Sequence, residues 1–482
     1  MFDFRPVGYV IGLLLVALGG SMFIPWAVDI IWNTGGGGTF AASAMITILF
    51  GGSMALASAN ARSPGLSLQH AFLLTVMSWL ALPVFAALPF WLGAPHASYT
   101  DAFFEAMSGM TTTGSTVFSN LEDLPMGTQL WRGMMQWFGG VGIIVVALAF
   151  LPTLKVGGMQ LFRSEGFDTL GKVLPRAGEI ASSISVVYLA LTLACILAYS
   201  AVGMDFFDAL VLSLTTISTG GFANSDASFG AFQGLPEYVA AIFMILASLP
   251  FVRYVQLMNG SARPLYRDSQ VRAFLMTALG LVLLLTFYRM FINGEASEES
   301  FREALFNVTS ILSGTGYSSV DYQLWGSFPV VLFFMLGLVG GCAGSTCCSI
   351  KIFRFQLLFI SIKQQIRRIH SPHGVFGARY AGRPVGEDVM SSVMAFFVMF
   401  MLTLGVLSVA LSLLGLDFIT AVSGAATALA NIGPGLGPEI GPSGNFGGLP
   451  DSAKWVLSFA MLLGRLELVA VFILFTPGFW RG

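Results

Sequence analysis

Residues 101–116 read Asp101-Ala-Phe-Phe-Glu-Ala-Met-Ser-Gly-Met-Thr-Thr-Thr-Gly-Ser-Thr116, an apolar run of helical length that ends in a glycine turn rich in hydroxyl groups. Three similar turns follow: Ile217-Ser-Thr-Gly-Gly-Phe222, Leu312-Ser-Gly-Thr-Gly-Tyr317 and Ala430-Asn-Ile-Gly-Pro-Gly435. With Gly114, Gly220, Gly316 and Gly433 taken as equivalent, the turn recurs about every hundred residues. This recurrence predicts four copies of one structural unit.

The composition is that of an integral membrane protein. Of the 482 residues, 55% are hydrophobic and only 10% are charged, and the mean hydropathy is +0.79. A water-soluble core cannot bury so much apolar surface. The cysteines lack the paired spacing of a metal site or a disulfide framework, so we expect free thiols at Cys195, Cys342, Cys347 and Cys348.

Ten apolar stretches are long enough to cross the roughly 30 Å hydrocarbon core at about 1.5 Å of helical rise per residue. They lie near residues 8–28, 39–59, 71–92, 134–154, 180–202, 238–258, 273–292, 328–360, 389–416 and 455–479. Each glycine turn ends a shorter apolar segment between two of these stretches, and such a segment should enter and leave the membrane on one side. The expected fold is all-α, with about ten transmembrane helices.

The helices are predicted to form four parallel units of helix, pore helix and helix, after an extra N-terminal helical pair. The expected boundaries are 1–65 for this pair and 66–160, 175–265, 268–370 and 385–482 for the four units. Two spans in each unit place every unit in the same orientation, unlike the halves of inverted-repeat transporters. The first apolar run has no clear small-x-small cleavage site, which favours a retained helix over a signal peptide.

Basic residues gather on one side of this predicted topology. Most of the 23 lysines and arginines fall at Arg5, at Arg62, within residues 155–176, 253–272 and 351–383, and at Arg481. Cytoplasmic loops are enriched in such residues. The glycine turns should therefore open outward, where acidic residues are common and would concentrate cations, although some of these acids are equally well explained as helix caps.

The four turns together suit a filter for a monovalent cation. Backbone carbonyls can replace the water around such an ion, and they point inward only where the backbone adopts dihedrals that glycine tolerates. A lone turn of this kind is more often a packing or hinge element, but four in equivalent places favour a filter. The candidate filter residues are Thr112, Thr113, Gly114, Ser218, Thr219, Gly220, Gly314, Thr315, Gly316, Asn431, Ile432 and Gly433.

These turns resemble the four pore loops of the Trk, Ktr and HKT superfamily of potassium transporters. The N-terminal pair and the ending Phe475-Thr-Pro-Gly-Phe-Trp-Arg481 make the chain most similar to the bacterial TrkH and TrkG branch. The resemblance implies a potassium uptake subunit of the bacterial cytoplasmic (inner) membrane, with potassium as its ion and no organic cofactor. It also implies a homodimer with one pore per protomer, surrounded by lipid, and a nucleotide-binding TrkA-like subunit on the cytoplasmic side. No nucleic acid is expected as a partner.

The eighth apolar stretch cannot be one helix. It starts at Phe328 and meets Gly340-Gly-Cys-Ala-Gly-Ser-Thr-Cys-Cys-Ser349 after about twelve residues, or roughly 18 Å of helix, which is too short to cross. The resemblance implies an intramembrane gate here, formed by Gly340, Gly341, Cys342, Ala343, Gly344, Ser345 and Thr346. Cys347 and Cys348 depart from the small residues expected next. A close helix crossing is the alternative.

Arg465 lies in the middle of the last apolar stretch, with Glu467 two residues farther on. An unpaired charge at this depth is costly and should face a pore or a partner. The resemblance implies that Arg465 lies near the gate and opposes cation leak, and the alternative is an arginine–carboxylate pair inside the bundle. The basic segment 350–369 fits a continued helix, a membrane-surface helix or a docking surface.

Two other classes of function remain to be weighed. A potassium symporter coupled to sodium or protons would need a central titratable group, for which Glu467 is the only acidic candidate. An intramembrane enzyme would need a converging nucleophile and base or paired aspartates within the spans, and the sequence offers neither. Glycine at position 114, where sodium-preferring plant relatives tend to have serine, implies a preference for potassium.

Overall fold

The computed structural model describes residues 3–60, 67–149, 177–294, 297–372, 374 and 376–481. These residues are almost entirely helical. Their strands are two short pairs: β1 (Val339–Gly340) runs parallel to β2 (Ile350–Lys351), and β3 (Arg379–Tyr380) runs antiparallel to β4 (Arg383–Pro384). The predicted all-helical class is confirmed. Five basic residues used for the orientation argument, Arg62, Lys155, Arg163, Lys172 and Arg176, lie outside the described residues.

Among the described residues, six helical runs are long and apolar enough to cross a membrane: Arg5–Trp32, Gly37–Ser58, Gln69–Leu92, Ala181–Ala201, Ser269–Ile292 and Glu387–Leu413. The helices that form these runs are α1 (Arg5–Ser21), α2 (Phe23–Trp32), α3 (Gly37–Ser58), α4 (Leu68–Ala86), α5 (Leu88–Leu92), α10 (Ala177–Ala201), α15 (Ser269–Tyr288) and α19 (Glu387–Leu413). A further long apolar helix, α7 (Met126–Ala149), adjoins undescribed residues. The chain is therefore a multi-pass membrane protein.

Two of the predicted spans are bent, which the apolar pattern did not predict. Over 238–258, α12 (Leu235–Ala247) and α13 (Phe251–Met258) meet at 90°. Pro250 lies between them and cannot continue a helix. Over 455–479, α22 (Asp451–Arg465) turns by 105° into α23 (Val469–Phe472) and the 3₁₀ turn Ile473–Phe475. Glu467 and Leu468 have positive φ values there, which end the helix.

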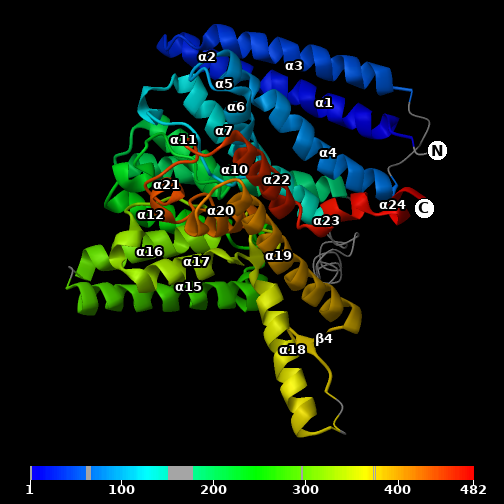
Figure 1. Ribbon diagram of the computed structural model, residues 1–482, viewed down its shortest axis with the longest axis vertical. Helices are drawn as coiled ribbons and strands as arrows, with labels where there is room; N and C mark the ends of the chain where they lie inside the picture. Colours follow the sequence, from blue (N-terminus) through cyan, green and yellow to red (C-terminus); the bar gives the residue numbers. More distant parts are fainter. Residues whose placement is uncertain are drawn as a thin grey trace.

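The eighth apolar stretch breaks as predicted. The helix α17 (Ser327–Gly337) ends after 11 residues, and α18 (Ile352–His370) begins only after the β1 and β2 strands. Figure 1 shows α18 extending away from the body of the molecule, with β4 beside it. The segment 350–369 is thus the continuation of a broken helix, one of the three arrangements that the sequence allowed.

Four short helices each precede one of the glycine turns: α6 (Tyr99–Met110), α11 (Phe206–Ile217), α16 (Ser297–Ser313) and α20 (Phe418–Ala430). Three of them, α6, α11 and α20, have polar N-caps, since Ser98, Asp205 and Asp417 each accept a hydrogen bond from a backbone N–H of the first turn. After the turns come α7, α12, α17 and α22. The remaining helices, α14 (Arg263–Arg267), α21 (Gly437–Ile440) and α24 (Pro477–Arg481), are short connections or ends.

The first helices form a hairpin against this bundle. In Figure 1, α1, α3 and α4 lie side by side, and the N-terminus lies near the C-terminal α24. Gly12 of α1 and Gly51 of α3 allow a close crossing, because a Cβ on Gly12 would approach Gly51 O to 2.7 Å. At the other end of the hairpin, Asp29 is buried and its Oδ1 accepts hydrogen bonds from Gly127 N (2.7 Å) and Thr34 Oγ1 (2.5 Å).

The Asp29 contact predicts a stability effect. Because Asp29 supplies an acceptor to the first turn of α7 from outside that helix, we expect Asp29→Ala to lower stability by about 1–2 kcal/mol, as other lost N-terminal caps do. Thermal unfolding of the purified protein in detergent measures the change. Asp123→Ala, which removes an exposed carboxylate that has no side-chain hydrogen bond or ion pair among the described residues, is the control and should leave the midpoint unchanged. An unchanged midpoint for Asp29→Ala would contradict the capping role.

Candidate functional site

The four glycine turns have the same local backbone structure. In each, a residue shortly after the end of the short helix donates its N–H to a carbonyl five residues earlier, at 2.8–3.1 Å. The donors and acceptors are Thr113 to Ser108, Gly220 to Thr215, Thr315 to Ser310 and Ile432 to Thr427. This common hydrogen bond makes the four donors equivalent. The counterpart of Gly114, Gly316 and Gly433 is therefore Gly221, so the sequence alignment of the second turn on Gly220 was wrong by one residue.

The backbone alternates in handedness through each turn. Positive φ values occur before the equivalent donors, at Thr112, Thr219, Gly314 and Asn431, and after them, at Gly114, Gly221, Gly316 and Gly433. An ordinary strand places successive carbonyls on opposite sides, whereas alternation between left-handed and right-handed dihedrals turns them to one side. In each turn, the two residues on either side of the donor thus adopt a conformation that most residues with a side chain avoid.

The turns contact one another in a closed cycle, here called the glycine ring. A Cβ built on Gly114 would lie closer than 3.0 Å to Gly220 O, one on Gly221 equally close to Thr315 O, and one on Gly316 to Ile432 O. The cycle closes where a Cβ on Gly433 would lie 3.0 Å from Thr113 O. Each glycine thus faces the equivalent carbonyl of the next turn. The structure therefore brings the candidate residues of all four turns together, with Ser218 at the C-cap of α11.

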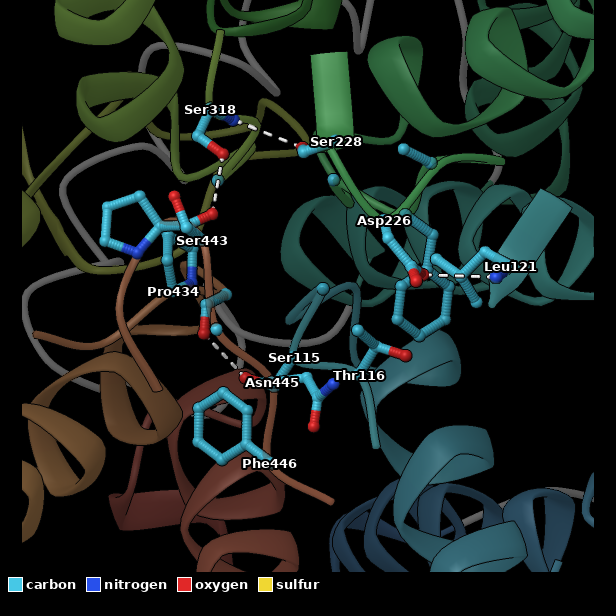
Figure 2. A pocket seen from close by; sticks show the side chains of 18 of the residues that line it. Ser115, Thr116, Leu121, Asp226, Ser228, Ser318, Pro434, Ser443, Asn445 and Phe446 are labelled. Atoms are coloured by element: carbon cyan, nitrogen blue, oxygen red, sulfur yellow. Dashed lines mark hydrogen bonds between the residues drawn. The ribbon is translucent and has the colours of Figure 1, made fainter. Parts of the chain in front are cut away.

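A cavity of about 180 Å³ opens on the side of the ring where the turns leave it. Its walls come from segments that follow each turn, including Thr116, Asp226, Ser318 and Asn445 (Figure 2). Asp226 accepts hydrogen bonds from Asn120 N (2.7 Å) and Leu121 N (3.1 Å). Polar groups from distant parts of the chain therefore surround the entrance to the ring.

Carboxylates keep a negative charge at this cavity. Beside Asp226, Glu122 Oε1 accepts hydrogen bonds from Ser225 Oγ (2.6 Å) and Asp226 N (3.1 Å). The Ser225 hydrogen bond lowers the pKa of Glu122 below its ordinary value, because it stabilises the ionised carboxylate. Glu122 therefore remains ionised at neutral pH, which favours cations near the cavity.

The Gly340–Ser349 loop is held by the bend between α12 and α13. Cys342 N donates to Ser248 O (3.0 Å), Thr346 Oγ1 donates to Ala247 O (3.1 Å), and Gly344 O accepts from Phe251 N (2.9 Å). From α15, Gln270 Oε1 accepts from Ala343 N at 2.9 Å. The predicted gate residues are consequently buried, and Ser345 donates within the loop to Cys342 O.

This loop lies on the other side of the glycine ring from the cavity. Ser349 N donates to Ala430 O, at the end of the short helix α20, at 3.0 Å. A Cβ on Gly314, in the third turn, would lie 3.8 Å from Cys348 N. The loop therefore contacts the third and fourth turns where the chain enters them.

Arg465 connects this loop to the first unit. Its Nη1 donates to Cys348 Sγ (2.6 Å) and to Thr346 O (3.4 Å), and its Nη2 donates to Gly139 O (2.8 Å). Gly139 packs against Met110 O at the end of the first short helix. The side chain of Arg465 is 1% exposed, so a buried guanidinium lies between the loop and the entry to the first turn.

The positive charge of Arg465 is not neutralised by a carboxylate in the part of the chain that the structure describes. Glu467, the acid nearest in sequence, pairs instead with Arg354 of α18 at 2.5 Å. Arg465 Nε has no hydrogen-bond partner there either. The alternative of an Arg465–carboxylate pair is therefore wrong, because the bend after Arg465 turns Glu467 toward α18.

Cys347 and Cys348 hold the loop through different contacts. Cys347 Sγ contacts Ser248 Oγ at 3.1 Å, whereas Cys348 Sγ accepts from Arg465. The predicted free thiols are confirmed at all four cysteines. The sequence alone singled out these two cysteines only as unexpected residues, since their partners are about a hundred residues away.

Comparison with known proteins gives a consistent result. The family described as "TrkH: Cation transport protein" matches residues 37–480. The chain is 49% identical over 412 residues to the Trk system potassium uptake protein TrkI of Halomonas elongata, covering 85% of this chain and 84% of that one. It is 37% identical to the Trk system potassium uptake protein TrkH of Escherichia coli K12, covering 99% of both. The crystal structure of the potassium transporter TrkH from Vibrio parahaemolyticus matches all of both chains with a TM-score of 0.91 at 33% identity.

Proposed function

Because the chain belongs to the TrkH family of cation transport proteins, we propose that it takes up potassium through a selective, channel-like pore in the bacterial cytoplasmic membrane. The observation that carries this proposal is the closed glycine ring, in which four equivalent turns face one another through backbone carbonyls. Carbonyl oxygens suit a large monovalent cation, since they coordinate it without a fixed charge that would trap it. The family consists of transporters, so the protein is not an enzyme.

The proposed pore has the fourfold organisation that the sequence predicts. Four parallel units, over 66–160, 175–265, 268–370 and 385–482, each supply one turn to the filter, and the N-terminal pair, over 1–65, packs outside them. The common hydrogen bond in the four turns and the cyclic order of their contacts support this division. The bends after α12 and α22 belong to the second helix of units 2 and 4, beside the Gly340–Ser349 loop.

The Gly340–Ser349 loop and Arg465 form the proposed gate. The loop contacts the glycine ring on the side away from the acidic cavity, and Arg465 places a buried positive charge beside it. A cation that leaves the ring toward the cytoplasm would have to displace the loop and pass this charge. Opening therefore requires the tethers at Ser248, Phe251 and Arg465 to release or move with the loop.

Several partners are part of the proposal. A homodimer with one pore per protomer and a TrkA-like, nucleotide-binding regulatory subunit on the cytoplasmic side follow from the family, and relatives are named as Trk system proteins. The helix α18 begins at the gate loop and projects from the bundle (Figure 1), so a subunit bound to it could act on the loop directly.

Flux measurements distinguish uniport from ion-coupled transport, the alternative function. We expect purified protein in liposomes to pass potassium and rubidium down their gradients, and opposing sodium or proton gradients to leave that flux unchanged. The ion pair between Glu467 and Arg354 supports uniport, because Glu467 is the one acid that the sequence offered as a coupling group. Uphill potassium movement driven by a sodium or proton gradient would establish symport instead.

Substitutions of Cys347 and Cys348 form a matched pair of variants, because Cys348 contacts Arg465 whereas Cys347 contacts Ser248. We expect Cys348→Ala to raise the basal potassium flux several-fold, because Arg465 loses a partner that fixes it against the loop. Cys347→Ala removes a thiol whose contact is with Ser248 instead of Arg465, and it should change the flux less. Liposome flux without a regulatory subunit measures both variants. Equal effects of the two substitutions would show that the Arg465 contact has no special part in closing the gate.

A further inference from the structure

A buried ion pair lies directly behind the glycine ring. Glu105 of the short helix α6 is 0% exposed and Arg132 of α7 is 1% exposed, and Glu105 Oε1 lies 2.8 Å from Arg132 Nε. Burying two charges costs free energy that is recovered only where the geometry is good and the remaining donors and acceptors are satisfied. The further partners of these two side chains therefore indicate what the pair does.

Glu105 holds the first turn. Its two oxygens accept from Thr116 Oγ1 at 2.9 and 3.1 Å, and Oε2 also accepts from Val117 N at 3.0 Å. Thr116 stands two residues after Gly114 of the ring. The carboxylate thus fixes the backbone immediately after the first turn.

Arg132 holds the corresponding part of the second turn. Its Nη1 donates to Ala223 O at 2.7 Å, and its guanidinium lies 4.3 Å above the ring of Phe222. Ala223 stands two residues after Gly221, which is the same position that Thr116 has relative to Gly114. Because Arg132 Nη2 also donates to Thr116 Oγ1 at 3.2 Å, one guanidinium connects equivalent points of two neighbouring turns.

A neutral side chain from the same helix adds to this support. One helical turn beyond Arg132, Gln136 donates from Nε2 to Gly220 O (2.6 Å) and accepts at Oε1 from Phe222 N (3.1 Å). Gln136 thereby brackets Gly221. Between the first and fourth turns the side-chain contacts are uncharged: Ser115 Oγ donates to Gly433 O at 2.7 Å, and Asn431 Nδ2 donates to Thr113 Oγ1 at 2.9 Å.

We propose that the Glu105–Arg132 pair is a positioning element that sets the spacing between the first and second turns and thereby contributes to ion selectivity. The inference rests on the proposed function of the ring as a potassium filter. A smaller cation such as sodium is coordinated well only if the carbonyls move inward, and a rigid clamp between two turns resists that movement. The planar fork of arginine suits this role because it fixes several acceptors in one plane.

The test measures selectivity separately from throughput. Glu105→Gln keeps the shape of the side chain but leaves Arg132 without its charged partner. We expect this variant to lower the potassium-to-sodium permeability ratio roughly tenfold, a factor that corresponds to the free energy of a lost hydrogen bond to a charged group. Arg132→Lys, which keeps the charge but not the fork, should lower the ratio less. Potassium flux per protein should change less than the ratio in both. Reversal potentials under bi-ionic conditions, with the full-length protein in planar bilayers, give the ratio.

Two further variants keep the test decisive. Thr116→Val removes the hydroxyl that joins both charged groups without leaving a charge unpaired, so it should lower the ratio even if Glu105→Gln folds poorly. Glu303→Gln is the matched control: its carboxylate is similarly buried and pairs with Arg289 at 2.7 Å, and it contacts no turn within the described residues. We expect Glu303→Gln to keep the wild-type ratio.

The outcomes separate the inference from the function on which it rests. A wild-type permeability ratio in both Glu105→Gln and Thr116→Val would overturn the positioning role. An equal loss of selectivity in Glu303→Gln would also overturn it, because the Glu105–Arg132 pair would then act only on the stability of the bundle. A wild-type protein that does not prefer potassium over sodium would instead overturn the proposed filter.

Discussion

Gly114→Ser is expected to lower the potassium-to-sodium permeability ratio by roughly tenfold, since about 1.4 kcal/mol of lost discrimination corresponds to that factor. Gly114 has a φ of +85°, which disfavours any residue with a Cβ. A Cβ there would also collide with Gly220 O, the equivalent carbonyl of the next turn. Either the serine displaces that carbonyl or the turn changes its dihedrals, and both disturb the ring.

The cyclic contacts extend this prediction to the other turns. Gly221→Ala and Gly316→Ala should also reduce the ratio, because a Cβ at either position meets the carbonyl of the following turn. Gly220→Ala tests the corrected register, since Gly220 supplies a carbonyl to the ring but meets the Gln136 side chain rather than a carbonyl. We expect it to affect selectivity less than Gly221→Ala. Bi-ionic reversal potentials measure all four variants.

Gly280→Ala is the control for these substitutions. Gly280 lies in α15, where an added Cβ would have no neighbour within 4 Å among the described residues. The reversal potential of Gly280→Ala should therefore equal that of the wild type. A Gly114→Ser variant with wild-type reversal potential would contradict the assignment of this turn to the filter. An effect of Gly220→Ala larger than that of Gly221→Ala would contradict the structural register.

Arg465→Ala is expected to raise the potassium flux by more than tenfold when no regulatory subunit is present. Two like charges about 8 Å apart in an effective dielectric constant of about 20 repel by roughly 2 kcal/mol, which corresponds to roughly thirtyfold in rate. The substitution removes this repulsion. It also releases the hydrogen bonds from Arg465 to Thr346 O and Cys348 Sγ, so the loop loses a tether at the same time.

Arg465→Lys separates these two contributions. Lysine retains the charge but cannot reproduce the fork that reaches both the loop and Gly139 O. If charge dominates, Arg465→Lys should remain nearly as closed as the wild type, whereas loss of the tether would make it leak. Potassium flux into liposomes measures both variants. An Arg465→Ala flux equal to that of the wild type would show that Arg465 has no part in closing the pore.

Features encoded locally could be predicted from the sequence. The apolar stretches marked the spans, and the distance from Phe328 to Gly340 required the helix break that the structure has between α17 and α18. The bend at Pro250 carried a signal as well, because proline interrupts helices. It was missed because the apolar pattern continues across it. The bend after Arg465 has no comparable signal, since Glu467 and Leu468 are not residues that favour a positive φ.

The contacts that build the candidate site depend on tertiary structure. Adjacent glycines at 220 and 221 left the second turn with two possible registers. The backbone hydrogen bond from Gly220 N to Thr215 O and the positive φ of Gly221 distinguish them. Glu105 and Arg132 are polar residues on two different helices, and nothing in their spacing indicates that both reach the ring. In the same way, the pairing of Glu467 with Arg354 follows from the bend that separates Glu467 from Arg465.

The most direct test of the proposed pore is the uptake of potassium, rubidium and sodium by liposomes containing the purified full-length protein, with and without a candidate nucleotide-binding subunit. Potassium and rubidium should enter faster than sodium, driven by their own gradients and the membrane potential, and the subunit should change the rate without changing this order. Equal entry of sodium and potassium, in protein that is folded and inserted, would contradict a potassium filter built from the four glycine turns.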